Sequence, residues 1–304
     1  MADIKLGINT GFALNRYSAP EDWTRVVGRE LGLKYVQLTA DLINPSLPDK
    51  IVASQIKKIR HECRKNSVVV AHTFTGAFTR VNHLAHPDEK IAKYWLGWFK
   101  RFVDISVALE AESLGSHFGI FSVPTMDNAT RRREVFARCV EHWQSIAAYA
   151  KKQGLKYLTW EPMSIPREMG ETIAETRRIQ LAVNDGSALP IRLCLDVDHG
   201  DVASRDPRDT DPYAWIAEFG RDAPLIHIKQ SLIDKGGHWP FLPDKNKAGK
   251  IKPQKVLRAI NDSGARDVLL LLELSFRERE PYESRVLRDL RTSVKYWQPF
   301  VAVK

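Results

Sequence analysis

Short apolar runs alternate with longer amphipathic segments along the 304-residue chain, and this alternation limits the fold more than any other feature. Residues 191–196 are a clear case, since five mostly apolar residues lead directly into Asp196. Continuous apolar runs are typical of buried parallel strands, and strands that alternate with helices form a parallel sheet. Eight strand–helix units predict an α/β fold, the closed (β/α)8 TIM barrel. The expected strands are residues 4–10, 33–38, 68–72, 111–118, 155–161, 191–196, 225–229 and 268–273.

The composition does not change along the chain in a way that would mark a domain boundary, so a single barrel domain over residues 1–304 is expected. An open, doubly wound sheet is the alternative. That fold usually carries Gly-x-Gly-x-x-Gly after its first strand, and the motif is absent here. Residues 231–252 form a long polar segment without expected secondary structure, and loops of that length are usually functional.

The net charge of +9 favours an anionic partner, such as a small phosphorylated substrate, or reflects a solvated basic surface. The positive residues are spread out and are not interleaved with aromatic ones, which argues against nucleic acid. The sequence has no apolar stretch long enough for a membrane span. It starts as a strand without a leader, and its three cysteines lie in apolar surroundings, so a reduced, cytoplasmic protein is expected. A homo-oligomer is compatible with the sequence, which leaves the oligomeric state open.

Metal-competent side chains recur at or near the ends of the expected strands. The carboxyl ends of all strands of a (β/α)8 barrel lie on one face, where the active site is found. A lone histidine at a strand end is more often part of a structural hydrogen bond, but the joint pattern is hard to explain as chance. A mixed oxygen and nitrogen set suits Mn²⁺, Co²⁺, Zn²⁺ or Mg²⁺. The residues expected to converge are His72, His117, Glu161, Asp196, His199, His227 and Glu273.

This order of residues resembles the xylose-isomerase-like TIM barrels, which include sugar and sugar-phosphate isomerases and epimerases. The shared pattern is Glu at strand five, Asp-x-x-His at strand six, His at strand seven and Glu at strand eight. Three longer segments resemble, more narrowly, the tetrulose-phosphate epimerases of bacterial erythritol breakdown. These segments are Trp160-Glu-Pro-Met-Ser-Ile-Pro-Arg-Glu168, Asp196-Val-Asp-His-Gly-Asp201, and His227-Ile-Lys-Gln-Ser231 with Lys235-Gly-Gly-His-Trp-Pro240.

The resemblance implies that one divalent ion is held by Glu161, Asp196, His227 and Glu273 and polarises a ketose carbonyl. Glu161 and Glu273 would then exchange a proton on opposite faces of a cis-enediolate. The implied substrate is a short ketose phosphate, a tetrulose phosphate such as erythrulose 1-phosphate. Asp198 should point to the other side of its strand and stay out of the site. The residues expected to contact substrate are His199, Glu168, His72, His117, Lys229, Lys235 and His238, with the lysines facing a phosphate or only solvent.

One departure from relatives and one rival interpretation bear on this hypothesis. Epimerases of free ketoses often carry Arg six residues after the strand-seven histidine, where this chain has Ile233. The alternative is an apurinic endonuclease of the same framework, which would use His72 and His117 as further metal ligands. Those enzymes also need Asp-x-His after strand seven, and the spacing from Asp234 to His238 is too long. The sequence leaves open the metal and the choice between epimerase and aldose–ketose isomerase.

Overall fold

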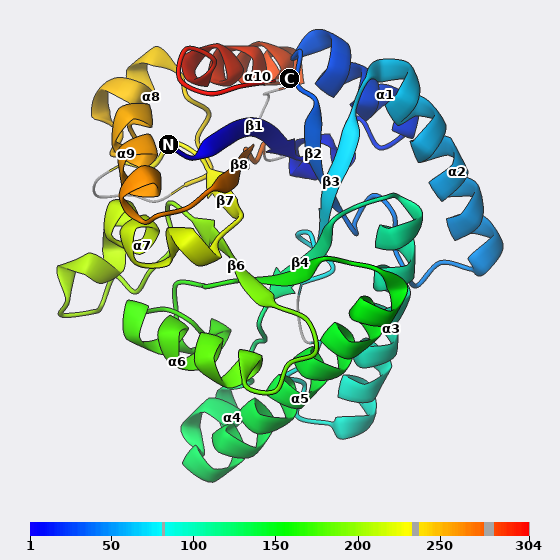
Figure 1. Ribbon diagram of the computed structural model, residues 1–304, viewed down its shortest axis with the longest axis vertical. Coiled ribbons are helices and arrows are strands. Elements are labelled where there is room, and N and C mark those ends of the chain that lie inside the picture. Colours follow the sequence, from blue (N-terminus) through cyan, green and yellow to red (C-terminus); the bar gives the residue numbers. More distant parts are fainter. Residues whose placement is uncertain (81–82, 233–236, 277–282, 304) are drawn as a thin grey trace.

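The computed structural model describes residues 1–80, 83–232, 237–276 and 283–303. Its eight parallel strands close into a barrel in which each strand pairs with its neighbour in the chain and β8 returns to β1 (Figure 1). The closing pair runs from Asp3 opposite Asp267 to Ile8 opposite Leu272. The predicted (β/α)8 fold is therefore confirmed. The strands are β1 (Asp3–Asn9), β2 (Tyr35–Thr39), β3 (Val69–Phe74), β4 (Ser113–His117), β5 (Tyr157–Glu161), β6 (Ile191–Asp196), β7 (Leu225–Ile228) and β8 (Asp267–Leu272).

The helices form a ring outside the strands, and their apolar faces cover the outer surface of the barrel (Figure 1). Several begin with proline in the first turn, as in α7 and α9, where the missing N–H needs no partner. α5 ends at Gly154, whose φ of 103° terminates the helix in the left-handed region. The helices are α1 (Pro20–Arg25), α2 (Asp49–Asn66), α3 (Glu89–Ala108), α4 (Val123–Asp127), α5 (Ala129–Gln153), α6 (Ile173–Asn184), α7 (Pro212–Phe219), α8 (Pro243–Ala248), α9 (Pro253–Asp262) and α10 (Glu283–Trp297).

Two short helices lie in segments where the sequence predicts only loop. α4 precedes α5, and α8 lies inside the polar segment 231–252. That segment is folded back on itself by backbone pairing of Gln230 with Trp239 and of Leu232 with Gly249. Neither helix exceeds 6 residues, so neither is long enough to show the apolar periodicity by which helices are detected in a sequence.

The barrel interior is apolar in its middle and polar at the carboxyl ends of the strands. Phe74, Cys194, Leu225, Leu269 and Leu271 form a buried cluster. Side chains alternate in direction along a strand, so the residues two positions further on also point inward. In β6, in β7 and just after β8 these residues are Asp196, His227 and Glu273. Asp196, His227 and Glu273 therefore lie just above the apolar cluster, at the carboxyl end of the barrel.

None of the helices within the described ranges is long and apolar enough to cross a membrane.

Candidate active site

Four side chains from consecutive strands meet at the carboxyl end of the barrel. Each of these side chains offers one atom that could bind a metal, and the four atoms lie within 4.8 Å of one another. The residues are Glu161, Asp196, His227 and Glu273. Nδ1 of His227 is central, at 2.9 Å from Oε1 of Glu161, 3.5 Å from Oε1 of Glu273 and 4.0 Å from Oδ2 of Asp196. The structure thus brings together the four residues expected to bind a metal.

This cluster places three carboxylates around one imidazole in a buried setting. Burial alone would raise the pKa of Glu161, but the charge of His227 and hydrogen bonds from His117 and His227 hold it well below its usual value. Burial would likewise raise the pKa of Glu273, but the positive charges of Lys229 and His227 outweigh burial and hold that pKa well below its usual value. Buried anions require compensating cations. Three carboxylates and one nitrogen are a donor set that fits a divalent ion such as Mn²⁺, Co²⁺, Zn²⁺ or Mg²⁺.

Lys229 compensates part of this negative charge from within the protein. Its Nζ lies 2.6 Å from Oδ2 of Asp196 and 2.9 Å from Oε2 of Glu273, and its side chain is 1% exposed. Burial would lower its pKa, but the charges of the two carboxylates raise the pKa above its ordinary value. The side chain does not line the cavity described below. Lys229 therefore holds two members of the cluster and does not reach into the space where a phosphate would lie.

Gln37 of β2, which the sequence does not single out, fixes the imidazole of His227 from across the barrel. The backbone N–H of Gly11 donates to Oδ1 of Asn9 at 2.8 Å, so the amide of Asn9 is oriented with Nδ2 toward Gln37. Nδ2 of Asn9 then donates to Oε1 of Gln37 at 2.6 Å. The same oxygen lies 2.7 Å from Nε2 of His227 and must accept its proton. Nδ1 of His227 is left to face the carboxylates, which is the atom a metal would bind.

A cavity of about 640 Å³ opens over this cluster. It extends from Glu161 and Glu273 toward the loops after β1, β2 and β3. Three predicted substrate contacts, His117, His199 and His238, line it. The strand-end pattern does not single out the other residues of the wall, because Asn9 and Thr39 at the ends of β1 and β2 are poor metal ligands and most of the rest, Asp41 included, lie in loops. These other residues include Asn9, Gly11, Leu14, Arg16, Thr39, Asp41, Gly76, Phe78, Arg80 and Ser275.

The three histidines hold different positions around the cluster. Nε2 of His117 lies 3.4 Å from Oε2 of Glu161. Nδ1 of His199 donates to the carbonyl of Pro162 at 2.8 Å, and among the described residues Nε2 has no hydrogen-bond partner. His238 is the most exposed, at 42% of its side chain, and its Nδ1 lies 3.3 Å from Oε2 of Glu273.

Other predicted site residues are not brought to the cavity. His72 lies deeper in the barrel, where its Nδ1 is 2.8 Å from Oγ of Ser113, and it does not line the cavity. Glu168 ends a short turn, Pro166–Glu168, and is also outside the cavity wall. Lys235 lies outside the described residues.

Asp198 lies outside the cluster, as expected, but alternation along the strand is not the reason. Residues two positions apart on a strand point to the same side, and Asp198 leaves the cluster because β6 ends at Asp196. Its Oδ2 accepts from the backbone N–H of Gly237 at 2.8 Å, and its Oδ1 accepts from the hydroxyl of Ser231. Nζ of Lys250 lies 3.4 Å from the same Oδ1. Asp198 therefore anchors the loop after β7 and takes no part in the metal-competent cluster.

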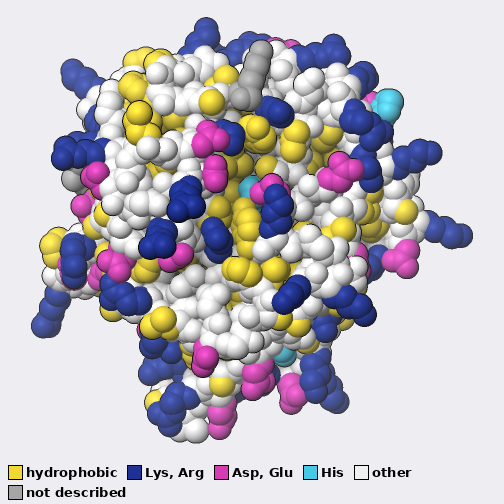
Figure 2. All heavy atoms as spheres, viewed as in Figure 1, with side chains coloured by type: hydrophobic (Ala, Val, Ile, Leu, Met, Phe, Trp, Pro, Cys, Tyr) yellow, Lys and Arg dark blue, Asp and Glu magenta, His cyan; other side chains and the backbone are white. Residues whose placement is uncertain are grey.

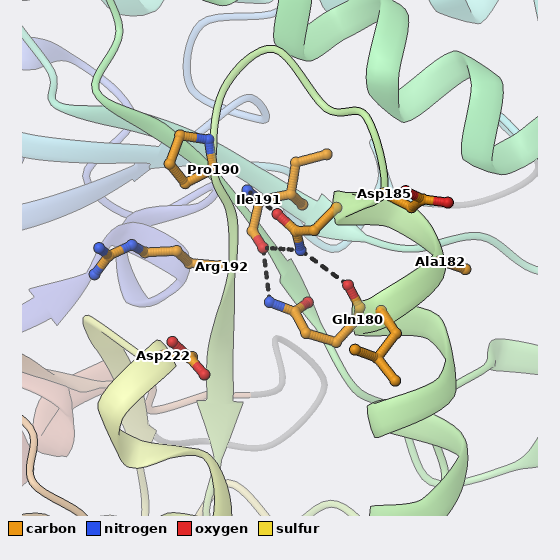
Figure 3. Close-up of a pocket in the computed structure, with 9 residues that line it drawn as sticks. Gln180, Ala182, Asp185, Pro190, Ile191, Arg192 and Asp222 are labelled. Atoms are coloured by element: carbon orange, nitrogen blue, oxygen red, sulfur yellow. Dashed lines mark hydrogen bonds between the residues drawn. The ribbon is translucent and has the colours of Figure 1, made fainter.

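A second hollow, of about 750 Å³, lies at the opposite end of β6 (Figure 3). Its wall contains Gln180, Ile191, Arg192 and Asp222. The carbonyl of Ile191 accepts hydrogen bonds from Gln180 at 2.7 Å and from Asn184 at 2.8 Å, so these polar groups satisfy one another. The amino end of a (β/α)8 barrel contributes to stability, whereas active sites lie at the carboxyl end. The smaller cavity over Glu161 and Glu273 is therefore the candidate active site.

Comparison with known proteins gives both family and structural relatives. Residues 27–294 match the family model described as xylose isomerase-like TIM barrel. The D-erythrulose 1-phosphate 3-epimerase of Brucella abortus (strain 2308) is 40% identical over 299 residues, which cover 98% of this chain and 96% of that protein.

Solved structures show the same architecture. A Rhodospirillum rubrum ATCC 11170 protein, provisionally assigned as a xylose isomerase, superposes with a TM-score of 0.88 at 28% identity, over 97% of this chain and 99% of that one. A D-psicose 3-epimerase from Clostridium cellulolyticum H10, solved with D-tagatose, gives a TM-score of 0.70 at 14% identity, over 98% and 99% of the two chains. At that identity the second comparison supports the fold alone.

Proposed function

The chain belongs to the xylose isomerase-like TIM barrel family and is an enzyme of the isomerase class, and from this premise we propose that it is a divalent-metal-dependent epimerase of a short ketose phosphate. The proposed substrate is a tetrulose phosphate such as erythrulose 1-phosphate, inverted at C3. The 40% identity to D-erythrulose 1-phosphate 3-epimerase over nearly the full length of both chains supports this choice.

The observation that carries the proposal is the placement of Glu161 and Glu273 around one point. Their Oε1 atoms lie 2.9 Å and 3.5 Å from the same nitrogen, Nδ1 of His227, and both residues line the cavity. Epimerisation removes a proton from one face of a carbon and returns a proton to the other face. Two carboxylates that reach one substrate from different strands can divide these two tasks.

The side chains of the site prepare both glutamates for proton transfer. The low pKa of each keeps it ionised before substrate binds, so that either can accept the proton of the C–H bond next to the ketose carbonyl. The other glutamate must take up a proton from solvent before it can deliver one to the opposite face. His117 and His227 hold Glu161, while Lys229 and His238 hold Glu273. A divalent ion bound by the four clustered residues would supply Lewis acidity to the carbonyl and its neighbouring hydroxyl. His199, whose Nε2 has no hydrogen-bond partner among the described residues, is placed to donate to or accept from a substrate hydroxyl.

The endonuclease alternative receives less support. In the described part of the chain, the metal-competent cluster comprises four residues and does not include His72 or His117. On the face drawn in Figure 2, lysine and arginine side chains are scattered among acidic ones and do not form a continuous basic stripe. Nucleic-acid binding proteins usually concentrate positive charge along the bound backbone.

Hydrogen exchange tests the proposal directly. The protein, chelated and then reloaded with Mn²⁺, Co²⁺, Mg²⁺ or Zn²⁺, is incubated with erythrulose 1-phosphate in deuterated water. We expect deuterium at C3 and both C3 epimers in the product, detected by NMR, and no exchange with the chelated protein. Absence of exchange with all four metals refutes the proposal, and nicking of abasic DNA would favour the endonuclease.

A further inference from the structure

The cations that face the active-site cavity differ in whether they already have an anionic partner. Arg16 is satisfied, because its Nε lies 2.7 Å from Oε2 of Glu283 and its Nη1 donates to the carbonyl of Phe276 at 2.8 Å. His238 is paired with Glu273. Arg80 has no carboxylate partner among the residues that the structure describes. Its polar neighbour is the ring of His117, whose Nε2 lies 3.4 Å from Nη1 of Arg80.

Three lysines among the described residues of the β7 region, Lys229, Lys245 and Lys250, do not offer an equivalent positive charge to the cavity. Lys229 is sealed between Asp196 and Glu273. Nζ of Lys245 lies 4.4 Å above the ring of Trp239, and Lys250 is paired with Asp198. None of the three lines the cavity.

The position of Arg80 suits an anionic group attached close to the reacting carbons. Arg80 follows β3 and contacts His117, which in turn lies 3.4 Å from the cluster residue Glu161. In a ketose 1-phosphate, one carbon and one oxygen separate the phosphorus from the carbonyl carbon, so a phosphate must lie next to the metal-competent cluster. The cavity continues from the cluster toward the β3 loop, which is where Arg80 stands.

Asp41 lies in the same wall of the cavity and already has hydrogen-bond partners. Asp41 accepts from the hydroxyl of Thr79 at 2.9 Å and from the backbone N–H of Phe78 at 3.3 Å. These contacts hold the β3 loop and leave the guanidinium of Arg80 without an ion pair to Asp41. A half-buried guanidinium beside a cavity is well suited to a phosphate, which it can bind through two parallel hydrogen bonds.

We infer that Arg80 binds the phosphate monoester of the substrate, and that this contact, not Lys229, Lys245 or Lys250, makes the enzyme prefer a phosphorylated ketose. The inference rests on the proposed function and names the side of the cavity on which the phosphate end of the substrate lies.

The test compares Arg80→Gln and Arg80→Lys with the matched control Arg131→Gln. Arg131 is exposed in the first turn of α5, so its replacement removes the same charge from the protein away from the cavity. The rate of deuterium uptake is measured for erythrulose 1-phosphate and for unphosphorylated erythrulose. We expect Arg80→Gln to lower kcat/KM for the phosphate ester about 10- to 100-fold, mainly through KM, and to lower the value for free erythrulose by a much smaller factor. Arg80→Lys should fall between, and Arg131→Gln should match the unaltered protein.

Titration of the metal-loaded proteins with inorganic phosphate gives a readout independent of turnover. Arg80→Gln should weaken phosphate binding by about tenfold or more, and Arg131→Gln should not. Equal losses of kcat/KM on both ketoses, or phosphate binding as strong in Arg80→Gln as in the unaltered protein, overturn the inference. Lack of uptake by the unaltered protein on either ketose refutes the proposed function instead, and the phosphate titration still tests Arg80.

Discussion

Oε1 of Gln37 lies 2.7 Å from Nε2 of His227, and this contact from β2 to β7 sets which nitrogen of the imidazole faces the carboxylate cluster. Replacing Gln37 with Leu removes the acceptor while keeping the size of the side chain. We expect the affinity for a divalent ion to fall about 10- to 100-fold, because the ring loses the partner that fixes its tautomer and orientation. Competition with a coloured chelator measures this affinity.

Gln37→Glu is the matched control for this prediction, since a carboxylate still accepts from Nε2 of His227 and from Asn9. We expect it to bind the ion more tightly than Gln37→Leu does. Equal affinities of Gln37→Leu and the unaltered protein would show that the tautomer of His227 is fixed by other contacts.

Glu273 reaches the cavity more openly than Glu161, with 24% of its side chain exposed against 3%. In Glu273→Gln the amide oxygen can still ligate an ion and still accept from Lys229, but it cannot take up a proton. We expect metal binding to survive in part while kcat falls about 10²- to 10⁴-fold. Metal affinity and deuterium uptake are measured on the same sample. Near-normal deuterium uptake by Glu273→Gln would show that Glu273 is neither the acid nor the base of the reaction.

The metal-competent cluster could be predicted from the sequence because its members lie at strand ends, where the barrel topology alone brings them together. The positions of Asp196, His227 and Glu273 depend only on alternation along a strand and on the closed order of the strands. The role of Gln37 depends on the register across the barrel, which residues so far apart in the chain do not reveal. The sequence predicts that Lys229 contacts substrate or only solvent, but whether it reaches the cavity or is sealed by Asp196 and Glu273 depends on side-chain packing.

Burial of Lys229 between two carboxylates predicts an effect on stability that depends on metal. Lys229→Met leaves Asp196 and Glu273 without the lysine that bridges them, and breaking a buried pair costs about 3–5 kcal/mol. We expect urea unfolding in the presence of a chelator to show a loss of that order, and a smaller loss with saturating divalent ion, which supplies positive charge to the same carboxylates.

The exposed pair Lys93–Glu89 on α3 provides the comparison for Lys229. Its side chains are 66% and 59% exposed, so Lys93→Met should change the free energy of unfolding by about 0.5 kcal/mol or less, with or without metal. If saturating divalent ion does not reduce the loss of unfolding free energy in Lys229→Met, the ion and Lys229 do not neutralise the same carboxylates.

His72, placed below the cavity, makes the stability of the fold depend on pH. Burial lowers the pKa of His72 to about 3, whereas in the unfolded chain it stays near its ordinary value of 6.5. Between these values the unfolded chain binds a proton that the folded chain excludes. The stability contributed by the neutral ring is therefore complete above about pH 6.5 and is lost as the pH falls, by up to about 1.4 kcal/mol per pH unit.

His72→Asn, whose amide can keep the hydrogen bond to Ser113, should show a shallower decline of the free energy of unfolding between about pH 6 and about pH 4.5. His61→Asn is the control, because the side chain of His61 is 69% exposed and its replacement should leave the decline unchanged. Urea unfolding at a series of pH values measures both, and parallel curves for His72→Asn and the unaltered protein would mean that His72 takes up its proton without unfolding.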